Sequence, residues 1–158
     1  MRLPVVAADL LTLLRRAVFA ILTIGLVGTG VELGLLGHTE DVWQWIPIAL
    51  IVLALAVQLW LVVLPGRYGV LAFRMVMIAF LAAGALGLVL HFTGNAEFEL
   101  EMYPSLTGFE LFREALSGAT PTLAPGAMLH LGLLGLLYTF RHPALKRSAV
   151  DDHSREDR

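Results

Sequence analysis

The sequence predicts an all-α membrane protein: four transmembrane helices in an antiparallel up-down bundle, with a short amphipathic helix in the outer loop. Three observations predict this fold. Of the 158 residues, 58% are hydrophobic and 15% are charged, against roughly 45–50% and about 25% in soluble domains. The apolar residues gather in four long runs, and mean hydropathy is +0.78. The cations gather beside one set of run ends.

The four apolar runs cover residues 17–37, 46–64, 70–92 and 124–140. At a rise of ~1.5 Å per residue, each run spans about 25–35 Å as a helix, which matches a hydrocarbon core of ~30 Å. Single runs of this length are expected to be helical, because lipid offers no hydrogen-bond partner to an exposed backbone. The fourth run begins with Pro125 and Gly126, and proline is tolerated in a first helical turn.

The cations predict the orientation of the bundle. The loops on one side hold Arg113 as their single cation among seven carboxylates. Because cytoplasmic loops are enriched in Lys and Arg, we expect both termini in the cytoplasm of a bacterial-type plasma (inner) membrane, with the acidic loops outside. The other ten cations flank the opposite side: Arg2, Arg15, Arg16, Arg67, Arg74, Arg141, Lys146, Arg147, Arg155 and Arg158.

The segments outside the four runs have distinct patterns. Residues 1–16 predict a cytoplasmic lead-in that lies along the inner leaflet, because residues 3–14 are mostly apolar. Residues 141–158 predict a cytoplasmic tail, disordered from residue 148 because almost every side chain there is polar or charged.

The outer loop, residues 93–123, divides into two halves. Residues 97–103 alternate strictly between acidic and apolar side chains, which predicts an extended segment that ends at Pro104. Thr107 and Glu110 have the spacing of a capping box, and Gly118 provides a stop. These signals bracket a short amphipathic helix, which we expect to rest on the outer surface of the membrane.

Glu32 is the one acidic side chain inside a predicted span. An acidic residue at mid-helix costs about 3 kcal/mol by insertion scales, so we expect another group to satisfy it. Gly25, Gly28 and Thr29 share its helical face. Small residues allow close helix packing, so this face is expected to point into the bundle.

Three histidines accompany Glu32 near the outer ends of the spans. Counted by helical rise from those ends, Glu32 lies about 8 Å deep, His130 about 9 Å and His91 about 2 Å. His38 directly follows the first run and matches His91 in depth. We therefore expect an outward-facing pocket, with Glu32 and His130 below and His38 and His91 at its mouth.

This group, Glu32, His130, His91 and His38, is the candidate metal site, because imidazole and carboxylate together bind divalent Zn, Cu, Mn or Fe. The alternative is that each ring bonds a backbone carbonyl or Glu32 in a structural role, since the four residues form no spaced motif such as H-E-x-x-H. A haem between two histidines fits less well, because His91 and His130 differ in depth by about 7 Å.

Several function classes are excluded by what the sequence lacks. A net charge of -2 provides no basic field for nucleic acid. The absence of cysteine removes disulfides, thiol redox chemistry and covalent c-type haem attachment. The sequence holds no Walker loop, nucleophile elbow or dinucleotide fingerprint, so an enzyme is not favoured.

Small residues favour a role in association within the bilayer. The first and fourth runs each carry a second glycine-rich face, and a face not used inside the bundle can meet another helix. The leading hypothesis is a non-catalytic accessory or structural subunit, in a homo-oligomer or a larger membrane complex, that acts through helix packing and its acidic outer cap. The alternative is a cation-binding (metal or proton) or redox membrane protein that uses the Glu/His pocket. The second faces consist of Gly30, Gly34 and Gly37 opposite Glu32, and Gly132 and Gly135 opposite His130.

Overall fold

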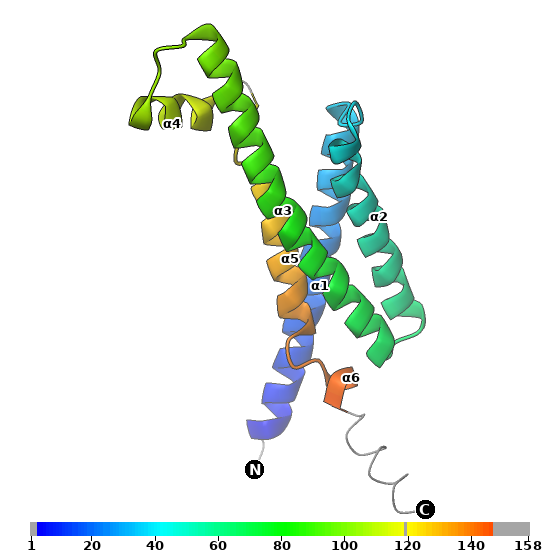
Figure 1. The fold of residues 1–158 in the computed structure, drawn as a ribbon. Coiled ribbons are helices and arrows are strands. Elements are labelled where there is room, and N and C mark those ends of the chain that lie inside the picture. Colours follow the sequence, from blue (N-terminus) through cyan, green and yellow to red (C-terminus); the bar gives the residue numbers. More distant parts are fainter. Residues whose placement is uncertain (1–2, 119, 147–158) are drawn as a thin grey trace, which may run out of the picture.

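The computed structural model describes residues 3–118 and 120–146, and this part of the chain is helical throughout apart from its turns (Figure 1). Three helical segments are long and apolar enough to cross a membrane: Asp9–Leu35, Val42–Val63 and Arg67–Met102. The described part of the chain is therefore all-helical, and its three long apolar helices indicate a membrane protein. The tail predicted to be disordered from residue 148 lies outside the described residues. The helices are α1 (Leu3–Leu35), α2 (Val42–Val63), α3 (Arg67–Met102), α4 (Gly108–Ser117), α5 (Gly126–Thr139) and α6 (Pro143–Lys146).

The first helix contains both the predicted lead-in and the first apolar run, because α1 continues without a break from Leu3 to Leu35. It ends in a Schellman motif: Gly37 adopts a left-handed φ of 63°, and the backbone N–H of His38 donates to the Leu33 carbonyl at 3.0 Å. After a short turn, Asp41 caps α2 in a capping box with Gln44. Both caps hold the α1–α2 turn in one conformation.

The third helix continues ten residues beyond the end of the predicted span at residue 92. The expected extended segment over residues 97–103 is wrong, because α3 remains helical to Met102. Five of its seven residues are Glu, Leu or Met, which are strong helix formers, and Pro104 disfavours helix in the residue before it. As a helix of 36 residues, α3 is about 54 Å long and exceeds the ~30 Å hydrocarbon core.

The predicted short helix of the loop is present as α4, with Thr107 at its N-cap and Gly118 at its C-cap. The predicted capping box is wrong, since the Thr107 side chain makes no capping hydrogen bond. The fourth predicted span is only partly helical. Its helix, α5, has 14 residues and is about 21 Å long, so α5 alone is too short to count as a crossing helix.

Packing is centred on α3, which contacts α2, α4, α5 and α6, while α1 contacts α2 and α5. The closest approach is between α3 and α5. A Cβ on Gly132 would lie 2.9 Å from the Met77 carbonyl oxygen, and one on Gly84 would lie 2.9 Å from the Leu129 side chain. Glycines on both helices thus bring the two backbones together. The core cluster includes Leu22 and Leu26 of α1, Ile51, Ala54, Val57 and Leu61 of α2, Val70, Phe73, Val76, Met77 and Phe80 of α3, and Met128 and Leu131 of α5.

The bundle has two chemically different ends. Figure 1 shows the N-terminal part of α1, the α2–α3 turn and α6 at one end, and the α1–α2 turn, the last turns of α3 and α4 at the other. We call the first the basic end, because it carries Arg15, Arg16, Arg67, Arg74 and Arg141. We call the second the acidic end, because it carries Glu40, Asp41, Glu97, Glu99, Glu101, Glu110 and Glu114.

Candidate functional site

Two of the four predicted site residues meet at the acidic end. His38 follows α1 and His91 lies on α3, and they are close enough for the charge of one to act on the other. The pKa of His38 is lowered, first by partial burial and second by the positive charge that His91 can carry.

The orientation of the His91 ring is set by a backbone group. Its Nδ1 lies 3.1 Å from the Pro121 carbonyl oxygen in the connection that leads into α5. Because a carbonyl only accepts, Nδ1 carries the proton in this contact, and Nε2 is left as the nitrogen able to accept a proton or bind a cation.

The other two predicted residues are not drawn into the bundle. Glu32 is exposed on α1, and the expectation that it points inward is wrong. A Cβ on Gly25 would touch Leu131 of α5 at 2.6 Å, so α1 and α5 are packed there. Two turns further along, α1 leans away from α3 and α5 (Figure 1), which leaves Glu32 uncovered.

His130 is likewise exposed, and its Nδ1 bonds the carbonyl of Gly126 in its own helix at 2.8 Å. The inward orientation expected for His130 is therefore wrong as well. The glycine face opposite it is used within the bundle, since Gly132 and Gly135 pack against Met77. Among the described residues, no group of three or more His, Asp and Glu side chains is arranged to hold a metal ion.

The acidic end has an organising residue that the sequence analysis missed. Asn95 is buried on α3 and bonds the C-terminal end of α4 and the residues that follow it. Its Nδ2 donates to the Ala115 carbonyl at 3.0 Å and the Thr120 carbonyl at 2.7 Å, and its Oδ1 accepts from the Thr120 backbone N–H at 3.1 Å. Asn95 is four residues after His91 and shares its face, which is the one signal that could have identified it.

Aromatic side chains complete the contact between α4 and α3. The rings of Phe92 and Phe112 have centroids 5.6 Å apart, and Phe109 stacks on Phe112 at 6.3 Å. Figure 1 shows α4 crossing α3 at about the level of the α1–α2 turn. The acidic cap, which we define as residues 97–118, is thus a fixed part of the fold.

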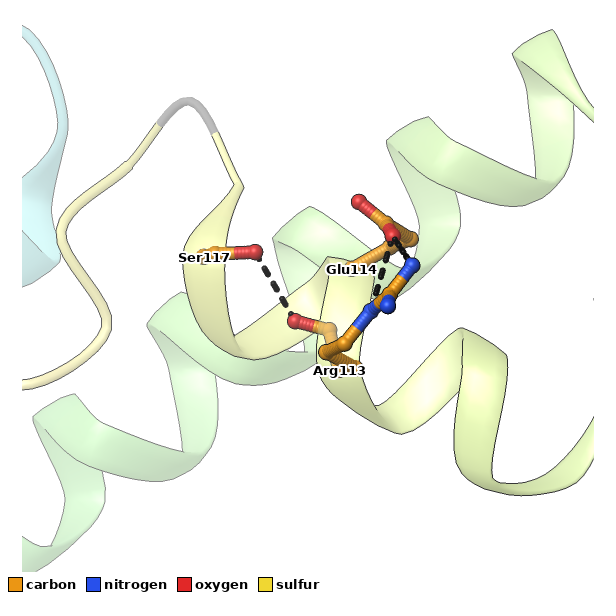
Figure 2. Close-up of polar contacts among 3 residues, drawn as sticks. All are labelled: Arg113, Glu114 and Ser117. Carbon is orange, nitrogen blue, oxygen red and sulfur yellow. Dashed lines mark hydrogen bonds and ion pairs between the residues drawn. The ribbon is translucent and has the colours of Figure 1, made fainter.

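The cap retains a surplus of negative charge. Figure 2 shows its single cation, Arg113, bonded to the neighbouring carboxylate of Glu114, while Ser117 Oγ donates to the Arg113 carbonyl at 2.9 Å. It is the one ion pair within the cap, residues 97–118. The carboxylates of Glu97, Glu101 and Glu110 are exposed. The cap can therefore attract cationic groups from solution or from a partner.

Comparison with known proteins does not assign this chain to a family. No protein-family model matches the chain, and neither a curated protein nor a solved structure matches it. The function therefore has to be argued from the residues alone.

Proposed function

We propose that this protein is a small multi-pass membrane subunit without chemistry of its own, which associates with a partner helix through the exposed face of α1. The observation that carries the proposal is the exposed carboxyl of Glu32 within the apolar segment Asp9–Leu35. An acidic side chain that faces lipid costs about 2.5–3.5 kcal/mol at the helix centre, and less toward the ends. A partner helix with a hydrogen-bond donor at this depth would remove that cost.

The face around Glu32 suits such a partner. It runs along α1 at helical spacing and is opposite the buried Leu22 and Leu26. No described atom outside the helix lies within 4 Å of a Cβ built on Gly28, so another backbone can approach closely there. We call this set the α1 face; its other members are Ile21, Ile24, Val31 and Leu35, all more than half exposed.

The partner we propose is a transmembrane helix that presents a hydroxyl, amide or basic side chain to Glu32. A second copy of this chain is the other occupant, with two Glu32 side chains facing each other. In both cases the acidic cap would add an electrostatic contact with a cationic segment of the partner. Such a contact helps to orient the partner more than it strengthens the binding.

For the topology, we propose that the basic end faces the cytoplasm of a bacterial-type plasma membrane, according to the positive-inside rule. The segment around α5 would then complete a fourth crossing, with the residues that precede it reaching the opposite interface. The close packing of α5 on α3 supports this, because α5 is covered by apolar helices on two sides.

A photo-cross-linking experiment tests the association. A benzoylphenylalanine at Ile24, on the α1 face, is expected to yield a defined covalent band in native membranes. The same probe at Val52, an exposed position of α2 at 62% accessibility, is the matched control and is expected to yield none. Gly28→Leu should abolish the Ile24 band. No band at Ile24, or equal bands at both positions, would contradict the proposal.

A second candidate function is a cation-binding or proton-handling role at the acidic end. It is favoured by one observation, the approach of His38 to His91. Two imidazoles leave a divalent metal incompletely coordinated, so a metal would need further ligands from water or a partner. Elemental analysis of protein purified without chelators tests this role: a stoichiometric metal that is lost in His91→Ala would support it, and absence of metal would leave only proton handling.

A further inference from the structure

The basic end contains a cleft that is separate from the α1 face and from the acidic cap. It lies between the N-terminal half of α1, the end of α2 and the junction of α5 with α6, and it encloses about 370 Å³. Its lining consists of Thr12, Arg15, Arg16, Phe19, Leu61, Val62, Tyr138, His142 and Pro143.

The polar part of the cleft is positively charged. Arg15 is held in place, because its Nη2 donates to the Arg141 carbonyl at 3.1 Å. That contact uses one of the five N–H donors of the guanidinium. Arg16 is exposed at the same level. Among the residues that the structure describes, no carboxylate lines the cleft, and the nearest acidic residue along α1, Asp9, lies outside it.

The neighbouring histidine reports the same positive field. The pKa of His142 is lowered, first by burial and second by the charge of Arg15. His142 therefore remains neutral when the cleft is empty of anions at neutral pH. An anion between these groups would be stabilised by both arginines, and none of the described lining side chains carries a negative charge that would repel it.

The remaining wall is apolar and rigid. The Tyr138 ring packs against Phe19 with centroids 5.1 Å apart and against Phe73 at 5.8 Å. Leu61 and Val62 of α2 complete the apolar part of the lining. The cleft thus has two guanidinium groups beside an apolar wall, and it lies near the start of the apolar segment of α1.

We propose that this cleft binds the headgroup of an anionic phospholipid. Arg15 and Arg16 contact the phosphodiester, and the Phe19–Leu61 wall receives the start of an acyl chain. Guanidinium matches phosphate oxygens in a bidentate geometry, and basic pockets between membrane helices are known to bind anionic headgroups. The apolar wall favours the lipid over free phosphate, which has no chain to fill it.

Native mass spectrometry of the full chain in a neutral detergent tests the proposal, with phosphatidylglycerol, phosphatidylcholine and inorganic phosphate as separate probes. We expect phosphatidylglycerol to be retained at least about tenfold more strongly than phosphatidylcholine. Arg15→Gln with Arg16→Gln should weaken its binding by about 10- to 30-fold, since each cation near an anionic headgroup contributes roughly fivefold. Because Arg15 also supports the fold, the single variant Arg16→Gln is tested beside it and should lose about fivefold.

The matched control removes two charges from the same end outside the cleft, through Arg67→Gln and Arg74→Gln. This control should keep its preference for phosphatidylglycerol. Equal retention of phosphatidylglycerol and phosphatidylcholine would overturn the proposal. It would also be overturned if the control variant lost as much phosphatidylglycerol binding as the Arg15/Arg16 variant, because binding would then depend on general surface charge. Binding of inorganic phosphate as strong as that of the lipid would also overturn it.

Discussion

The side-chain amide of Asn95 in α3 donates a hydrogen bond to the hydroxyl of Thr122, 3.0 Å away and 27 residues later in the chain. The Thr122 hydroxyl in turn donates to the Ala115 carbonyl at the end of α4, also at 3.0 Å. Both side chains are buried. Two uncharged residues therefore join the acidic cap to the start of α5, and they position the Pro121 carbonyl that His91 bonds.

Replacing Asn95 by Leu should loosen the acidic cap. The variant removes both hydrogen bonds between the Asn95 side chain and the Thr120 backbone, and it leaves the Ala115 carbonyl with the Thr122 hydroxyl as its one side-chain donor. A buried polar group that loses its partner costs about 1–3 kcal/mol. We expect a lower thermal midpoint by circular dichroism and faster hydrogen exchange in α4. Thr93→Ala is the control, because the Thr93 hydroxyl bonds only carbonyls of its own helix. Unchanged exchange in α4 would contradict the role of Asn95.

Replacing Gln58 by Leu, unlike Asn95→Leu, should not destabilise the fold. Gln58 is the other buried amide, and its Nε2 has no partner among the described residues. Its Oε1 accepts from the Thr23 hydroxyl at 3.1 Å, but that hydroxyl also reaches the Phe19 carbonyl at 2.8 Å. The variant therefore removes an unsatisfied donor without creating one, and the free energy of unfolding should stay within about 1 kcal/mol or rise. A loss as large as that of Asn95→Leu would show that the Gln58 amide has an essential partner.

Replacing Gly132 by Ala should separate α5 from α3. The new Cβ would lie 2.9 Å from the Met77 carbonyl oxygen, and a backbone atom in a helix cannot move aside easily. Overpacking of this kind costs about 1–3 kcal/mol, which denaturation in detergent can measure. Gly34→Ala is the matched control, since no described atom outside its helix lies within 4 Å of its new Cβ. The control should be neutral or stabilising by up to about 1 kcal/mol. Equal effects of the two variants would contradict the packing described.

Acidification should destabilise the α1–α2 turn through His38. Its pKa is lower in the folded chain than its ordinary value of 6.5, so the unfolded chain takes up a proton first as the pH falls. The free energy of unfolding should therefore decline below about pH 6.5 and level off once the folded chain is protonated too.

The His38→Gln variant isolates this effect. His142 also has a lowered pKa and remains in both proteins, so the difference between the two pH profiles belongs to His38. Thermal midpoints from pH 7.5 to 5 should fall more steeply in the natural chain. Parallel profiles would contradict the burial of His38 next to His91.

Hydropathy was enough to predict the apolar helices, because burial in lipid depends on each residue's own polarity. The second run, predicted over residues 46–64, forms the helix Val42–Val63. The alternation of acidic and apolar residues over 97–103 led to the wrong prediction of an extended segment, because most of these residues also have high helix propensity. The lean of α1 that exposes Glu32 could not be predicted, since it depends on contacts such as Gly25 with Leu131. Asn95 was missed because a single amide carries no periodic signal.

Single-cysteine labelling tests the central claim that these helices lie in a membrane, with the basic end in the cytoplasm. The natural chain has no cysteine, so one can be placed at each of three exposed positions: Ser105 near the acidic cap, Ala56 in α2 and Tyr68 at the basic end. In intact cells, a membrane-impermeant maleimide should label Ser105→Cys alone. Tyr68→Cys should react only after permeabilisation, and Ala56→Cys should stay unlabelled. Labelling of Ala56→Cys in native membranes, or of Tyr68→Cys but not Ser105→Cys in intact cells, would contradict this account.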